Sequence, residues 1–140
     1  IHPDNLKHVE AAAKGKIPRS KTTFVSPFDP LVWDRKRALE LFNFDYKIEV
    51  YTPAPKRKYG YFTLPILYNN ALIGRIDPKA HRKEGVFEVK ALHLEPGVVV
   101  DDTLVAELKS ALRACAAWHK TPQVIVRAAT KPGLAKRLSD

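Results

Sequence analysis

Methionine is absent from the sequence, and cysteine and glutamine occur once each, as Cys115 and Gln123. A lone cysteine excludes an intramolecular disulfide and a thiolate zinc cluster, which fits a reducing cytoplasm. The histidines are too dispersed for the spacing of a zinc site, and we expect no metal or other cofactor. Because the chain begins at Ile1 and holds no methionine, we expect it to be the remainder of a longer protein.

Long apolar runs are also absent. No segment approaches the roughly 20 apolar residues that cross a bilayer, and no signal peptide is visible. What is abundant is positive charge, since 24 lysines and arginines against 15 acidic residues leave a net charge of +9 over 140 residues. The length suits one ordinary domain. The charge favours a polyanionic partner such as DNA, RNA or an anionic membrane surface, and a merely solvated basic surface is the alternative.

The first third of the chain predicts two helices. Apolar residues recur at helical spacing across residues 4–14, and residues 15–23 lack periodicity, as in a linker or ordered loop. Pro27 and Pro30 then predict a turn. Asp34 can cap a second helix whose first turn carries the three cations at 35–37.

Strand signals follow. Tyr46 to Val50 alternate in polarity, which is typical of a half-buried strand. Residues 62–66 and 72–76 flank Asn69 and Asn70, a pair that tolerates positive φ, so we expect a hairpin there. Pro65 places the first of these strands at an edge or a bulge.

A second hairpin is predicted around residues 83–85. Its second strand, residues 86–94, changes phase after Ala91, which a β-bulge would explain. The clearest helix starts at Asp101 or Asp102 and is stopped by Thr121-Pro122. Its apolar stripe includes Leu104, Leu108, Ala111, Leu112, Cys115 and Trp118. A short strand at 123–128 and a last helical turn at 132–138 complete the chain. Consecutive antiparallel strands with helices at both ends predict an α+β fold, with a curved antiparallel sheet or partial β-barrel.

Three stretches together resemble a known family. They are SPFDPLVWDRKR from Ser26, LFNFDYKIEVYTPAPKRKYGYFTLPIL from Leu41, and IGRIDPKAHRK from Ile73. From about Ser26 to Glu95 the chain resembles the C-terminal region of the YcaQ/AlkZ-like crosslink-repair DNA glycosylases, which carry winged-helix DNA-binding domains.

The resemblance implies a monofunctional glycosylase that hydrolyses the N-glycosidic bond of alkylated or crosslinked purines without a cofactor. It also implies a division into residues 1–23, a helix and linker from a preceding winged-helix region, and residues 24–140, a C-terminal β-barrel-like domain. The family's catalytic motif is a Gln-x-Gln type pair. Since Gln123 is the only glutamine, no catalytic residue can be transferred to this chain, and we expect the chain alone to lack the activity of the intact enzyme.

Two basic segments are candidate contacts for double-stranded DNA, alkylated or crosslinked. Lys56, Arg57 and Lys58 beside Tyr59 combine cations for phosphates with an aromatic face. The alternative is an exposed loop whose tyrosines fold back onto the core.

The second basic segment is the predicted hairpin, which could enter a groove or grip the backbone. Its candidate contact residues are Arg75, Lys79, Arg82 and Lys83. A solvated face is the alternative. Among the cations at 35–37, Arg35 is expected to pair with Asp29 or Asp34 as a structural clamp. Whether Lys36 and Arg37 contact phosphate is left undecided by the sequence.

Two catalytic alternatives are weaker. Asp29, Asp34, Asp45 and Asp77 could supply paired carboxylates for glycoside hydrolysis, but turn carboxylates commonly bond the backbone of their own turn. Cys115 and His119 share a helical face and could form a nucleophile and base, but we expect both in the core.

These observations predict a cytoplasmic, nucleoid-associated DNA-binding domain of a repair glycosylase. The competing hypothesis is a non-enzymatic DNA-binding or regulatory protein of the winged-helix type, in which the same basic segments only grip phosphate.

Overall fold

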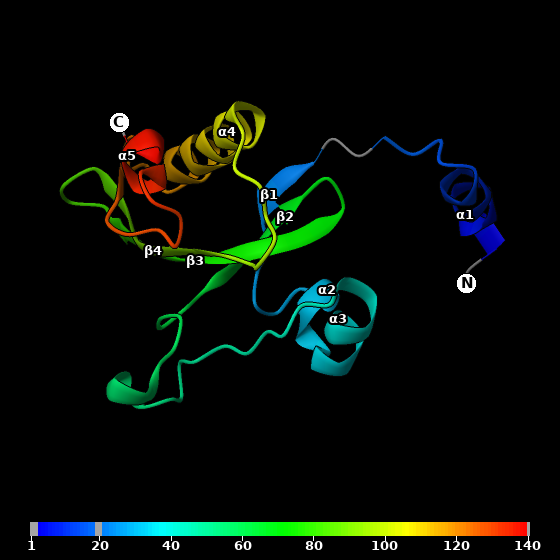
Figure 1. The fold of residues 1–140 in the computed structure, drawn as a ribbon, viewed down its shortest axis with the longest axis horizontal. Helices are drawn as coiled ribbons and strands as arrows, with labels where there is room; N and C mark the ends of the chain where they lie inside the picture. Colours follow the sequence, from blue (N-terminus) through cyan, green and yellow to red (C-terminus); the bar gives the residue numbers. More distant parts are fainter. Residues whose placement is uncertain (1–2, 19–20, 140) are drawn as a thin grey trace.

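The structure is a computed structural model that describes residues 3–18 and 21–139. It has a five-stranded curled sheet with helices at both ends of the chain, so the predicted α+β fold is confirmed (Figure 1). The strands are β1 (Thr22–Phe24), β2 (Leu64–Tyr68), β3 (Ala71–His81), β4 (Val86–Leu94) and β5 (Gln123–Val126). The helices are α1 (Leu6–Ala13), α2 (Pro30–Trp33), α3 (Arg35–Phe42), α4 (Asp102–Trp118) and α5 (Leu134–Leu138), with short 3₁₀ turns at Pro3–Asn5 and Ala54–Lys56.

Both predicted hairpins are confirmed. Asn69 and Asn70 join β2 to β3 with φ values of 47° and 66°, the left-handed geometry that suits the twist of a two-residue hairpin. The turn between β3 and β4 ends at Gly85, whose φ is 68°. The turn residues alone therefore predicted that β3 pairs with β2 on one side and with β4 on the other.

Two bulges bend this sheet. Ile66 and Leu67 pair with Gly74 and Leu72, so Ile73 is an extra residue on β3. Pro65 pairs with Arg75, and β2 lies between β1 and β3, so the expected edge position of Pro65 is wrong and the bulge begins one residue later, after Ile66. On β4, Lys90 is extra because its neighbours Val89 and Ala91 pair with consecutive residues of β3. The phase change predicted near Ala91 is thus a β-bulge, and such bulges increase the local bend and twist of a sheet.

The expectation of a wholly antiparallel sheet is wrong at its last strand. β5 pairs with β4 in parallel, with Phe87 opposite Val124 and Val89 opposite Val126. Parallel neighbours need a long crossover connection, and α4 provides it. The sequence pattern reports the presence of β5 but carries no signal for its direction.

The expected strand from Tyr46 to Val50 is also wrong, because this segment has no strand partner. The alternation corresponds to burial only at the start of the segment, where Tyr46 is 2% exposed whereas Asp45 and Lys47 are exposed; Glu49, a polar position of the pattern, is buried. The hydroxyl of Tyr46 donates a hydrogen bond to the carbonyl of Thr63 at 2.6 Å. An extended segment can thus bury side chains against a sheet without pairing with a strand.

Apolar side chains form a core on each face of the sheet. The larger core lies under α4 and α5, which Figure 1 shows together above the sheet. The smaller one lies on the other face, between the sheet and helices α2 and α3, and consists of Val25, Val32, Phe44, Tyr46 and Leu72. The first core holds the strands together, and the second fixes the segment that leads to the candidate site.

Helix α4 starts as predicted, but its apolar stripe is not buried along its whole length. Leu104, Leu108 and Leu112 are buried, but the Trp118 side chain is 80% exposed. The helix ends at Trp118, so this last residue projects beyond the part that the sheet covers. The core position predicted for Trp118 is therefore wrong.

The first helix is confirmed as α1, which buries no side chain. The predicted linker at 15–23 is described only in part, because Arg19 and Ser20 lie outside the described residues, and its last two positions belong to β1. In the described part of the chain, no helix has the length and apolar character needed to cross a bilayer.

The N-cap of α4 gives the first prediction. The Asp101 carboxylate accepts a hydrogen bond from the Leu104 amide at 2.7 Å. Asp101→Ala should lower the free energy of unfolding by about 1 kcal/mol, measured by urea denaturation. Asp101→Asn retains an acceptor oxygen and should stay close to the unaltered protein. An equal loss in both variants would contradict a capping role.

Candidate nucleic-acid interface

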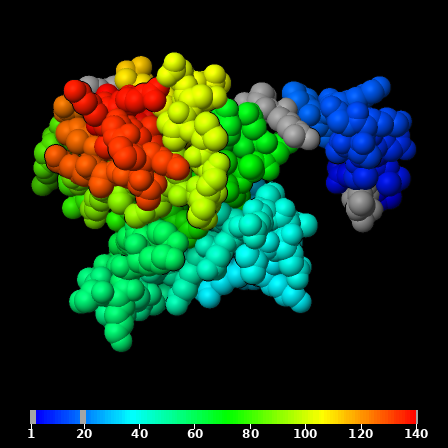
Figure 2. Space-filling model, in the orientation of Figure 1, coloured from blue at the N-terminus to red at the C-terminus, as the bar shows by residue number. Residues whose placement is uncertain are grey.

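Residues 56–61, here called the basic loop, project from the sheet on the side away from α4 and α5. Figure 1 shows this segment below the sheet, and Figure 2 shows it as a protrusion of the surface. Lys56 and Lys58 are exposed and Arg57 is half-buried. The loop therefore presents cations to solvent, as a phosphate contact requires.

A buried carboxylate orders this loop. Glu49 is 7% exposed, and it accepts hydrogen bonds from the amides of Lys58, Tyr59 and Gly60 at 2.8, 2.7 and 3.2 Å. Burial alone would raise the pKa of Glu49, but these three donors and the charge of Lys47 lower it below its ordinary value of 4.5. Glu49 is therefore ionised at neutral pH and fixes three successive loop residues.

Arg75 requires a correction to its predicted role. Its side chain is 2% exposed, and its guanidinium donates to the Asp45 carbonyl at 3.0 Å and to the Glu95 carboxylate at 2.6 Å. Because almost no surface of the side chain remains for a phosphate, Arg75 is a buried structural cation. The pattern of basic residues could not distinguish it from its exposed neighbours.

Tyr59 is also less available than its place in the motif indicates. The Arg75 guanidinium lies 4.1 Å from the Tyr59 ring centroid, and the ammonium of Lys58 lies 4.8 Å from it. The ring of His93 is nearly perpendicular to the same ring, with 5.2 Å between the two ring centroids. This arrangement matches the alternative in which the tyrosine folds back onto the core.

Tyr61 is the exposed aromatic residue of the basic loop, with 51% of its surface accessible. The guanidinium of Arg57 lies 4.9 Å from its ring centroid, and Nε of Arg57 donates to the Thr52 carbonyl at 2.9 Å. A cation and an aromatic face are thus held together at the surface. The sequence motif contained both residues but did not show which tyrosine would face solvent.

Gly60 permits a close approach that no other residue allows. Its φ is 140°, and a Cβ built on it would lie 2.4 Å from the Asp77 carboxylate. Asp77 is itself 7% exposed. The glycine therefore lets the loop lie directly against β3.

The second basic segment, residues 79–83, lies at the turn between β3 and β4. Lys79, Arg82 and Lys83 are exposed, and Arg82 lies within 3.3 Å of Nδ1 of His119 at the end of α4. Figure 1 places this turn apart from the basic loop. The structure therefore does not bring the two predicted basic segments together in one patch.

The cations at 35–37 do not form the expected clamp. Arg37 hydrogen-bonds the Pro30 carbonyl, and Lys36 lies 3.9 Å from Glu40. Within residues 3–18 and 21–139, no hydrogen bond or ion pair joins Arg35 to Asp29 or Asp34. It is Arg37, and not Arg35, that ties α3 to the preceding turn.

Two of the four carboxylates considered for catalysis have local roles. Asp29 accepts from the Leu31 amide at 2.9 Å and Asp34 from the Arg37 amide at 3.1 Å, so they cap α2 and α3. Turn carboxylates that bond the backbone in this way were the alternative to a catalytic pair. Within the described residues, no group of three or more histidine, cysteine or acidic side chains could hold a metal ion.

Cys115 and His119 do lie near each other, but not in the core. Both line an apolar pocket, and Cys115 is half-buried instead of buried. Burial raises the pKa of the Cys115 thiol, and burial followed by the charge of Arg82 lowers the pKa of His119. A thiol with a raised pKa is a poor nucleophile at neutral pH.

The Glu49 contacts give the second prediction. Glu49→Gln should destabilise the protein by about 1–3 kcal/mol at pH 7, because hydrogen bonds to an ionised carboxylate are replaced by weaker ones. A carboxyl group whose pKa is lowered by folding stabilises the protein above its unfolded value near 4.5, and this contribution is lost as the pH falls through the folded value. The difference between the two proteins, measured by urea denaturation, should therefore shrink near pH 3.

The control is Glu84→Gln, at an exposed carboxylate in the turn between β3 and β4. It should leave stability nearly unchanged at pH 7. A Glu49→Gln difference that stays constant from pH 7 to pH 3 would show that the charge of Glu49 does not order the loop.

Comparison with known proteins agrees with these features. No solved structure matches the chain. The sequence matches the family described as DNA glycosylase AlkZ-like over residues 2–118, a range that contains the basic loop, the buried Arg75 and all of α4. DNA is the substrate of such repair enzymes, which are hydrolases of the N-glycosidic bond. The chain belongs to the AlkZ-like DNA glycosylase family.

Proposed function

We propose that this chain is the C-terminal, DNA-binding domain of a glycosylase that acts on alkylated or crosslinked purines. The observation that carries the proposal is the basic loop, in which Lys56 and Lys58 are exposed and Glu49 fixes the backbone from Lys58 to Gly60. The loop contacts the phosphates of double-stranded DNA without reading its sequence, as contacts to phosphate do.

The order of the loop supports this role. A flexible loop loses conformational entropy when it binds, and a loop already held in one geometry loses less. Glu49 bonds the amides of Lys58, Tyr59 and Gly60, and Arg75 packs on the Tyr59 ring. The cations are thereby held in place before DNA arrives.

The turn between β3 and β4 provides a second contact. Lys79, Arg82 and Lys83 are exposed there, and a basic hairpin can grip the backbone of a duplex. Because the two basic segments lie apart, each should contribute separately to the number of phosphates that the protein neutralises.

The third prediction concerns the loop cations. Changing Lys56 and Lys58 together to glutamine should weaken binding to alkylated and plain duplex alike. Each lost phosphate contact should flatten the slope of log affinity against log salt by about 0.9. The measurement is fluorescence anisotropy with a labelled duplex at several salt concentrations.

The matched control changes Lys7 and Lys14 to glutamine, two exposed lysines on and beside α1. It removes the same net charge from a different part of the surface. If both double variants lose affinity and slope equally, binding reflects net charge and the basic loop has no special place in it.

The fourth prediction is that the chain does not release alkylated bases from duplex DNA. Its single glutamine cannot form a Gln-x-Gln type pair, and Asp29 and Asp34 already bond backbone amides of their own turns. Base release should stay at the level without protein in a gel assay. Release above that level, abolished by Asp77→Asn, would place catalysis in this chain.

A further inference from the structure

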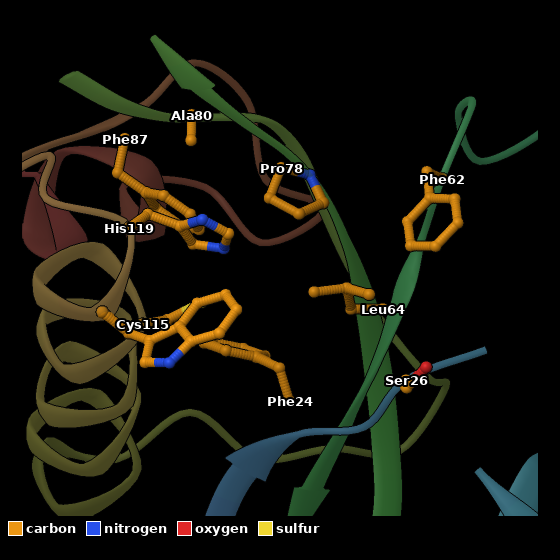
Figure 3. Close-up of a pocket in the computed structure, with 10 residues that line it drawn as sticks. Phe24, Ser26, Phe62, Leu64, Pro78, Ala80, Phe87, Cys115 and His119 are labelled. Atoms are coloured by element: carbon orange, nitrogen blue, oxygen red, sulfur yellow. The ribbon is translucent and has the colours of Figure 1, made fainter. Parts of the chain in front are cut away.

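An apolar pocket opens on the face of the sheet opposite the basic loop. Its volume is about 580 Å³, within the range of small-molecule sites, and it lies between the strands and the end of α4. Figure 3 shows Phe24, Phe87 and His119 around a common space, with Phe62 on the far side from α4. We call this space the Trp118 pocket, after the exposed tryptophan on its rim.

Aromatic rings dominate this pocket. The His119 ring stacks on Phe87 at 5.7 Å with an interplanar angle of 22°, and it meets the Trp118 ring edge at 4.6 Å. The side chain of Trp118 is 80% exposed. Apart from its perpendicular contact with His119, this large indole at the mouth of an aromatic cavity is left in water and offers a surface for stacking.

The charge beside the pocket is positive. Arg82 is joined to His119 at 3.3 Å, and Lys83 follows it in the same exposed turn. None of the residues that line the pocket is acidic. Cations for phosphates thus stand directly beside aromatic faces, the combination by which proteins hold unpaired nucleotides.

His119 adds a polar group to this apolar lining. Burial and the charge of Arg82 lower its pKa, so the ring is neutral at pH 7. Because Nδ1 accepts the hydrogen bond from Arg82, the proton of the neutral ring lies on Nε2, which can donate to a base.

We propose that the Trp118 pocket takes an unpaired nucleobase of a DNA strand whose phosphates are held by Arg82 and Lys83. The inference rests on the proposed function, because it needs a DNA strand at the turn between β3 and β4, and it adds a site that recognises the base itself. The base stacks on Trp118 and is bounded by the rings of His119 and Phe62.

The test compares two single strands of about ten nucleotides, a length within the site sizes of such proteins. One is oligothymidylate, and the other is an abasic strand of equal length and charge. We expect oligothymidylate to bind the chain about tenfold more tightly, as one stacked base accounts for. Trp118→Ala should remove this difference and leave binding of the abasic strand unchanged.

The matched control is Trp33→Ala, at the other tryptophan, which is 72% exposed and lies outside the pocket. It should preserve the preference for oligothymidylate. In a Trp33→Phe background the remaining fluorescence comes from Trp118, and oligothymidylate alone should quench it.

A second measurement needs no change in the pocket. Cys115 is the only cysteine and lines the same space, so oligothymidylate should slow its labelling by a thiol reagent and the abasic strand should not. This readout holds even if Trp118→Ala fails to fold.

The outcomes separate the two proposals. Equal binding of both strands, without quenching or protection, would overturn the base site and leave the phosphate contacts intact. Binding of neither strand, nor of duplex, at low salt would overturn the proposed function as well. Protection of Cys115 that depends on protein concentration alone would show that a second copy of the chain covers the pocket, and would overturn the inference.

Discussion

The burial of Arg75 is the constraint on which the side of the domain that carries the basic loop depends. A buried guanidinium loses its hydration, and this loss of free energy must be offset by interactions with partners in the protein. Removal of one partner from a buried ion pair is therefore strongly destabilising. The partners here come from distant parts of the chain: the Asp45 carbonyl, the Glu95 carboxylate, and the rings of Phe44 and Tyr59. The cation on β3 therefore connects the segment after α3, the basic loop and the end of β4.

Glu49 complements this cation with a buried negative charge. Its carboxylate bonds three amides of the basic loop, and Gly60 brings the same loop against Asp77. Irregular backbone normally lies exposed and mobile. In this domain, buried charges give a loop the fixed geometry that hydrogen-bond ladders give to strands.

The sequence predicted features that depend on local chemistry. The Asn69-Asn70 turn, the cap at Asp34 and the phase change near Ala91 each arise from the conformational preference or pattern of a few adjacent residues, and all three were confirmed. The same reasoning placed the basic loop, although the structure does not test its contact with DNA.

Features that depend on the tertiary fold could not be predicted in this way. Whether a basic residue is buried like Arg75 or exposed like Lys79 depends on what packs against its strand. The same holds for the aromatic residues, since Tyr59 is covered and Trp118 is exposed. The parallel direction of β5 is set by the crossover through α4, and the residues of β5 themselves do not indicate this direction.

That crossover has a consequence for the way the domain folds. The hairpins of β2 to β4 join neighbours in sequence and can form early, whereas β5 can pair with β4 only after the chain from Glu95 to Pro122 has closed a long loop. The turn that carries Arg82 therefore belongs to the part of the sheet that assembles locally. The aromatic residues of the Trp118 pocket come together only when α4 packs on the sheet.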